Sequence, residues 1–155
     1  MRYAIAAAAL IWLTAGAAGA APTAAPDFLA ANAKAAGVVS LPGLQYKVLA
    51  SGPASGATAT RKDDVTVRYE GRLTDGTVFD ASPDGGKGTT VFPLKVLIPG
   101  WVEALQLMRP GDVWMLYLPP NLAYGAKGVG PIPPDATLIF KVELVSAAPH
   151  VEAPK

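Results

Sequence analysis

A single helical segment lies among a series of short extended segments, and this arrangement restricts the chain to few folds. Residues Gly100–Met108 carry apolar side chains at helical spacing, with Trp101 at the start. Apolar and polar residues alternate instead in Val65–Leu73 and Thr137–Leu144, as expected of half-buried strands. Turns and loops, rather than helical crossovers, connect the extended segments, so the strands are expected to be antiparallel. The pattern predicts an α+β fold with a five- to six-stranded antiparallel sheet wrapped around one short helix.

The remaining elements follow from the same patterns. Val113–Leu118 is apolar on both faces, which predicts a central strand covered on both sides. Asp75-Gly76 predicts a hairpin turn between two strands. The other predicted elements are a helix over Asp27–Gly37, with Asp27 as N-cap and Gly37 as the left-handed stop, and strands over Leu44–Val48, Thr77–Phe79 and Val91–Leu94.

The first twenty residues have the pattern of a secretory signal peptide. Arg2 gives a positive start, Ala4–Leu13 is an apolar run, and Ala18-Gly19-Ala20 offers the small residues that a signal peptidase reads. The run is shorter than the ~20 residues needed to cross a bilayer. We therefore expect a signal peptide over residues 1–20, a lead-in with a short helix over 21–42, one folded domain over 43–146 and a disordered tail over 147–155. Export to the periplasm, or secretion, would follow, with no membrane attachment after cleavage.

Composition excludes several classes of function. The chain has no cysteine, so neither a disulfide nor a thiol nucleophile is available. Without Arg2, the 13 basic residues become 12, which balance the 12 acidic ones. The basic pair Arg61-Lys62 is followed at once by Asp63-Asp64, so no basic surface for nucleic acid is predicted.

Few residues remain for conventional catalysis. The one histidine, His150, lies in the predicted tail, where it is not expected to serve as a base or a metal ligand. Gly85–Thr89 lacks the spacing of a phosphate-binding loop and is interpreted as a surface loop. Asp75 and Asp80 form an alternative carboxylate pair for a glycoside hydrolase, although the Asp-Gly turn accounts for Asp75 more simply. Neither a metal nor a cofactor is predicted.

Aromatic residues are concentrated at strand ends and loop junctions. Each of them, taken alone, is explained by core packing. Trp101, however, lies in the first turn of its helix, which cannot cover it completely. If the others face it from the sheet, they line an apolar bowl with Trp101 as its floor. The aromatic residues concerned are Tyr69, Phe79, Trp101, Tyr124 and Phe140.

Three stretches in the same order resemble the FKBP-type peptidyl-prolyl cis-trans isomerases, the immunophilins that bind macrolides. They are VTVRYEGRLTDGTVFDAS, VFPLKVLIPGWVEALQLMRPGD and LAYGAKGVGPIPPDATLIFKVEL, and the resemblance covers about Gly43–Val145. The stretches FLAANAKAAGV and LPGLQYKVL are similar to the lead-in of the exported macrophage-infectivity-potentiator-type branch. That branch usually carries a long helical dimerisation segment, whereas about twenty residues precede Leu41 after the predicted cleavage site. A monomer is therefore expected.

The resemblance implies a substrate pocket and a mechanism that requires no cofactor. The backbone N–H of Ile98 and the hydroxyl of Tyr124 would each bind a substrate carbonyl, and Asp80 would lie at the rim. The sequence departs from the family pattern at two places. Thr90 stands where an aromatic residue is common, and the loop Gly125–Pro133 is one residue shorter than in the small cytosolic members and lacks their histidine. The implied pocket residues are Tyr69, Phe79, Asp80, Leu97, Ile98, Trp101, Tyr124, Ile132 and Phe140, of which Phe79, Asp80, Ile98 and Tyr124 form the implied catalytic set.

The predicted function is isomerisation of X-Pro bonds in proline-containing, unfolded or partly folded exported proteins, with macrolides as inhibitors. The alternative is a folding chaperone or adaptor that binds polypeptide through the same pocket with little turnover.

Overall fold

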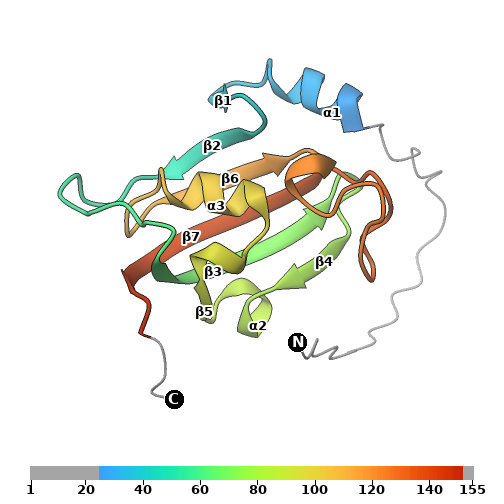
Figure 1. The fold of residues 1–155 in the computed structure, drawn as a ribbon. Helices are drawn as coiled ribbons and strands as arrows, with labels where there is room; N and C mark the ends of the chain where they lie inside the picture. Colours follow the sequence, from blue (N-terminus) through green and yellow to red (C-terminus); the bar gives the residue numbers. More distant parts are fainter. Residues whose placement is uncertain (1–24, 152–155) are drawn as a thin grey trace.

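A seven-stranded antiparallel sheet forms the frame of the computed structural model, which describes residues 25–151 (Figure 1). The strand order is β1-β2-β6-β7-β3-β4, and β5 pairs with β3 beside β4. The predicted fold class is confirmed, with one strand more than the predicted maximum. The strands are β1 (Val38–Ser40), β2 (Gln45–Ala50), β3 (Asp63–Leu73), β4 (Val78–Ala81), β5 (Thr90–Pro93), β6 (Val113–Leu118) and β7 (Leu138–Pro149).

The helix α3 (Pro99–Leu105) lies across one face of the sheet (Figure 1). Its buried residues meet the inward side chains of β3, β6 and β7, which alternate with outward ones along each strand. The connections on either side of α3 are short, so the helix can reach only this face of the sheet, and its apolar side packs there. The fully buried core side chains include Leu94, Leu105, Met108, Leu116, Leu118, Leu138, Val142 and Leu144.

Strand β6 is central but is not equally buried on both faces, contrary to the prediction. Its inward residues are buried, whereas its outward residues are only half-buried. The short helix α1 (Ala25–Asn32) contributes to the outer cover, with the Phe28 and Tyr117 rings 6.3 Å apart. Helix α1 begins before Asp27 and ends five residues before Gly37, so neither predicted cap is correct.

Three short turns complete the described elements. They are α2 (Pro83–Gly86), η1 (Leu94–Val96) and η2 (Pro120–Leu122). Within α2, Asp84 and Gly85 have left-handed backbone angles, with φ of 56° and 64°, so this segment is a tight turn rather than a regular helix. It lies in the predicted glycine-rich surface loop.

The predicted disordered tail is wrong for its first residues. Strand β7 continues to Pro149, with Ala147 opposite Val65 and Pro149 opposite Asp63. His150 is also held, since its backbone N–H donates to Lys62 and its Nδ1 lies 2.8 Å from an Asp64 carboxylate oxygen. Backbone pairing with β3 needs no alternation of apolar side chains, so the sequence pattern gave no sign of it.

The predicted signal peptide and the last four residues lie outside the described part of the chain. Between residues 25 and 151, no helix has the length and apolar character needed to cross a membrane.

Candidate functional site

The start of α3 places Trp101 against the sheet. Ile98 is the N-cap residue, and its carbonyl accepts the N–H groups of Trp101 (3.0 Å) and Val102 (3.1 Å). A Cβ at Gly100 would lie 2.5 Å from Leu118 Cδ2, so only glycine permits this close approach of helix to strand β6. Trp101, in the first turn of the helix, is consequently buried against the sheet, with 4% of its surface exposed.

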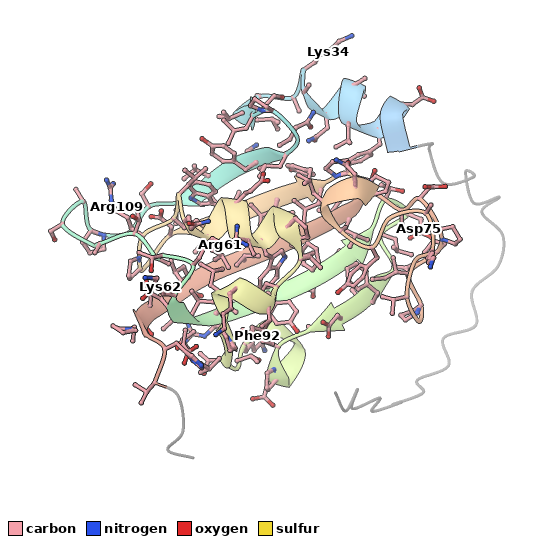
Figure 2. The ribbon with its side chains drawn as sticks, viewed as in Figure 1. Lys34, Arg61, Lys62, Asp75, Phe92 and Arg109 are labelled. Atoms are coloured by element: carbon pink, nitrogen blue, oxygen red, sulfur yellow. The ribbon has the colours of Figure 1, made fainter. Side chains whose placement is uncertain are left out.

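Aromatic rings from three strands surround Trp101 edge-on. Tyr69 from β3 lies 5.1 Å from the indole at 86°, and Phe140 from β7 lies 5.2 Å away at 83°. Phe92 from β5, labelled in Figure 2, is 6.4 Å away at 84°. Edge-to-face pairs of this kind contribute about 0.5–1.5 kcal/mol each beyond their burial. These rings form a connected aromatic cluster, in which the orientation of each ring depends on its neighbours, and the predicted apolar bowl stays a prediction.

Phe79 extends this cluster toward strand β4. Its ring lies 5.5 Å from that of Phe140, at 89°. Both rings occupy the space over Gly71, where a Cβ would lie 2.6 Å from Phe79 Cζ and 2.7 Å from Phe140 Cε1. Gly71 is thus required for the Phe79–Phe140 contact, because any side chain there would displace one ring.

A polar pair borders the aromatic cluster. The Tyr69 hydroxyl donates to Asp80 Oδ2 over 2.9 Å, while Asp80 Oδ1 accepts the N–H of Ala81, also over 2.9 Å. Burial raises the pKa of the Tyr69 phenol well above its ordinary value, and the hydrogen bond and negative charge of Asp80 raise it further. Tyr69 is therefore a neutral donor, and Asp80 is oriented by two hydrogen bonds at an exposed position.

The rim of the cluster comes from two loops. Leu97 and Ile98 are half-buried against the core just before α3. Ile132 is buried in the same core from the loop after β6, whereas Tyr124 in that loop is 39% exposed. Tyr124 is close enough to Tyr69 to contribute to the raised pKa of its phenol. Ring contacts and one hydrogen bond thus link five of the predicted pocket residues, namely Tyr69, Phe79, Asp80, Trp101 and Phe140.

The alternative carboxylate, Asp75, belongs to the β3–β4 turn (Figure 2). Its Oδ1 accepts the Thr77 N–H over 2.8 Å, and this hydrogen bond lowers the pKa of the exposed carboxyl group. Gly76 follows with a φ of 89°, as an Asp-Gly turn requires. The turn accounts for Asp75 without a catalytic role. In the described residues, no three histidine or carboxylate side chains are grouped as metal ligands.

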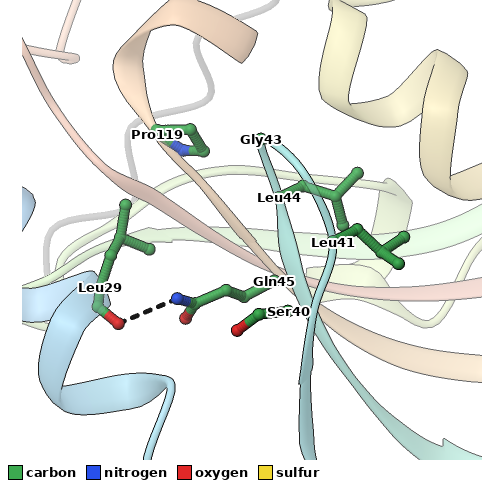
Figure 3. Close-up of a pocket in the computed structure, with 7 residues that line it drawn as sticks. All are labelled: Leu29, Ser40, Leu41, Gly43, Leu44, Gln45 and Pro119. Carbon is green, nitrogen blue, oxygen red and sulfur yellow. Dashed lines mark hydrogen bonds between the residues drawn. The ribbon is translucent and has the colours of Figure 1, made fainter.

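Two hollows on the surface lie away from the aromatic cluster. One, of about 200 Å³, lies between α1, the β1–β2 turn and Pro119 (Figure 3). Its wall includes Gln45, whose amide is already engaged, donating to the Leu29 carbonyl and accepting from Asn32, both over 2.9 Å. The other, of about 310 Å³, lies on the outer face of the sheet beside Met115 and Ile139. Neither contains a residue of the predicted pocket.

Comparison with known proteins identifies the family. Residues 56–145 match the model of the FKBP-type peptidyl-prolyl cis-trans isomerases, which is more than half of the chain. The chain belongs to the FKBP-type family.

Similar proteins and structures agree with this assignment. The chain is 54% identical over 121 residues to the peptidyl-prolyl cis-trans isomerase Mip of Coxiella burnetii, covering 77% of this chain and 51% of that protein. It is 51% identical over 122 residues to the macrophage infectivity potentiator of Trypanosoma cruzi, covering 77% of this chain and 61% of that protein. The chain spans about half the length of the first of these relatives.

Two solved structures share the fold. The peptidyl-prolyl cis-trans isomerase from Pseudomonas syringae has a TM-score of 0.74 and 36% identity, covering 87% of this chain and 98% of that one. FkpA from Escherichia coli has a TM-score of 0.75 and 40% identity, covering 81% and 58%. Both confirm the predicted FKBP-like architecture.

Two residues that shape the aromatic cluster, Phe92 and Gly71, were missing from the predicted set. Phe92 lies opposite Val65 in the β3–β5 pairing, so it shares the inward face. Thr90, which the resemblance already placed beside the pocket, lies two residues before Phe92 and therefore on the same face of β5. Alternation along β5 would thus have indicated Phe92. Gly71 carries no side chain to notice, and its importance depends on the two rings that meet above it.

Proposed function

We propose that the FKBP-type domain is a peptidyl-prolyl cis-trans isomerase that acts on X-Pro bonds in polypeptides. The observation that carries the proposal is the set of edge-on rings around Trp101, bordered by the Tyr69–Asp80 pair. The names of the similar proteins support it, since several are called peptidyl-prolyl cis-trans isomerases.

The physical basis is the solvation of the amide. Rotation about a peptide bond has a barrier of ~18–20 kcal/mol because it removes amide resonance. The planar amide is the more charge-separated form, so water stabilises it more than the twisted form. An aromatic site that excludes water removes this preference. Binding is then tighter for the twisted amide than for the planar one, which is the condition for catalysis.

Polar groups at the rim position the substrate. The N–H of Ile98, at the entrance of α3, is proposed to bind one substrate carbonyl, and the Tyr124 hydroxyl another. Asp80 keeps its carboxylate beside the ring cluster through Tyr69, and so fixes the charge that faces the bound amide. No step requires a covalent intermediate.

The proposed substrates are proline-containing exported polypeptides. Uncatalysed prolyl isomerisation takes tens of seconds, which limits the folding of such chains. The proposal of export rests on the leader pattern of residues 1–20, and one relative, from Legionella longbeachae, is named an outer membrane protein. A monomer, and inhibition by macrolides, complete the proposal.

A refolding assay tests this function. The chain without residues 1–20 should accelerate the proline-limited refolding of a second protein, and a macrolide should suppress the acceleration. Phe79→Ala and Asp80→Ala should reduce it, whereas Phe28→Ala, which removes an aromatic ring from α1, should not. Failure of the unmutated protein to accelerate refolding would refute the proposal. Suppression of aggregation without acceleration would favour the chaperone alternative.

A further inference from the structure

The sheet has a gap beside Tyr69, one of the residues of the site. The outer edge of β3 pairs first with β5, as far as Val67 opposite Thr90. It then pairs with β4, beginning with Glu70 opposite Ala81. Tyr69 lies between the two partner strands, so neither strand supplies the backbone groups that pair with it along this edge.

Ser82 fills this gap. Its backbone N–H donates to the Tyr69 carbonyl over 2.9 Å, and its Oγ accepts the Tyr69 N–H over 3.1 Å. The hydroxyl also lies 3.4 Å from the Tyr69 carbonyl oxygen, to which it donates weakly. One residue therefore pairs with both backbone groups of Tyr69. Ser82 is 2% exposed, so water does not replace these hydrogen bonds easily.

The loop that follows Ser82 is built closely against the same carbonyl. The Gly86 N–H donates to the Ser82 carbonyl over 2.9 Å, which closes the turn α2. A Cβ at Gly86, where φ is 90°, would lie 3.1 Å from the Tyr69 oxygen. The loop thus holds Ser82 in place and leaves little space for Tyr69 to shift.

Ser82 also lies two residues after Asp80, in the same short segment. That segment therefore holds Tyr69 twice, through its backbone at Ser82 and through its hydroxyl at Asp80. We propose that Ser82 is a positioning residue, which fixes the Tyr69–Asp80 pair beside Trp101 in the geometry that isomerisation requires. This inference rests on the proposed isomerase function.

The hydroxyl group is the chemical requirement at this position. Alanine would leave the buried Tyr69 N–H without its acceptor, whereas threonine keeps an oxygen in the same place. The expected result is that Ser82→Ala lowers kcat/KM in a proline-peptide isomerisation assay about tenfold. Ser82→Thr should keep most of the wild-type kcat/KM. Ser146→Ala, an exposed serine on β7, is the matched control, and Leu44→Val controls for a modest loss of stability away from the site.

A double-mutant cycle separates positioning from a general effect on stability. If Ser82 acts through Tyr69, Ser82→Ala should lower kcat/KM less than about twofold in a Tyr69→Phe background. An equal loss of kcat/KM in both backgrounds would overturn the inference. So would a Ser82→Ala variant as active as an active wild-type protein. In either case the proposed function would stand.

A second measurement does not depend on activity. Hydrogen exchange of the Tyr69 amide and the NMR signal of its hydroxyl proton report the two contacts directly. We expect Ser82→Ala to accelerate exchange and shift the hydroxyl signal, and Ser82→Thr to preserve both. If the wild type showed no isomerisation, the proposed function would fail, and the inferred role in catalysis would fail with it, whereas unchanged signals in Ser82→Ala would refute the positioning alone.

Discussion

Two tryptophans are buried in the same core, and only one belongs to the candidate site. Trp101 and Trp114 are similarly buried, with 4% and 6% of their surfaces exposed. Within the described residues, neither indole N–H has a hydrogen-bond partner. Trp114, however, stacks face to face on Tyr46, with ring centres 4.3 Å apart and an angle of 11°.

The surroundings rather than the burial distinguish the two. The stacked Tyr46 covers one face of Trp114, whereas the neighbours of Trp101 meet it edge-on from β3, β5 and β7. A polar pair, Tyr69 and Asp80, also borders the Trp101 cluster. Under the proposed function, the aromatic cluster with its polar edge binds and orients the substrate amide, whereas the stacked pair serves core packing. Variants made at both tryptophans test this distinction.

The largest contrast is expected from the tryptophans themselves. Trp101→Leu and Trp114→Leu should each reduce the free energy of unfolding by about 2 kcal/mol, because each leaves a partly filled cavity. Trp101→Leu should also lower kcat/KM about a hundredfold, since the floor of the site is lost. Trp114→Leu should stay within about twofold of wild type. Denaturant unfolding and peptide isomerisation measure the two effects, and equal activity losses would abolish the distinction.

A pair of glycines should give the next largest contrast. A Cβ at Gly71 would strike the Phe79 and Phe140 rings, and one at Gly52, in the loop after β2, would lie 2.0 Å from the Pro110 carbonyl oxygen. Gly71→Ala and Gly52→Ala should each destabilise the fold by about 1–3 kcal/mol through overpacking. Only Gly71→Ala should lower kcat/KM, by about tenfold, because it displaces rings of the site. A fully active Gly71→Ala protein would show that ring placement is not critical.

A smaller effect is expected at the side of the site. Phe92 lies 6.2 Å from Tyr69 and 6.4 Å from Trp101 and stabilises both rings. Phe92→Leu should lower kcat/KM about threefold, as expected for the loss of one or two edge contacts. Phe28→Leu, on the outer face of the sheet, is the control and should leave kcat/KM unchanged. Identical activities of the two variants would remove Phe92 from the site.

The smallest contrast concerns Tyr69 and a non-titrating control, Phe28, at alkaline pH. The pKa of Tyr69 is raised in the folded protein, so above the ordinary tyrosine pKa of about 10 the unfolded chain releases a proton that the folded chain keeps. The unfolded state then binds fewer protons, and the free energy of unfolding falls as the pH rises. Tyr69→Phe should make this fall shallower, whereas Phe28→Leu, which removes no titratable group, should not. Denaturant unfolding between about pH 8 and 11 measures the slopes, and parallel slopes for Tyr69→Phe and wild type would contradict the assigned cause.

Most of the framework could be predicted because it is encoded in local periodicity. The alternation in β3 and β7, the continuous apolar run in β6 and the helical spacing around Trp101 each predicted the correct element. Strand β1 has three residues and no alternation to detect. The end of β7 depends on pairing with the first residues of β3, which no local pattern reveals.

The site was predictable where side chains carry it and less so where the backbone does. The aromatic residues that the resemblance implied lie together around Trp101 and along β4. Ser82 and Gly71 matter because of residues that are distant from them in the sequence. Their importance follows from which strands meet beside Tyr69 and which rings meet above Gly71.

The strand order also determines when the fold can form. Strand β7 comes last among the described strands, yet it lies in the middle of the sheet, between β6 and β3 (Figure 1). A growing chain that ends before Leu138 holds β1, β2 and β6 in one group and β3, β4 and β5 in another, without the strand that pairs with both groups. The aromatic cluster depends on the same strand, since Phe140 is part of β7. The protein therefore cannot close its sheet or assemble its site during synthesis until β7 has emerged.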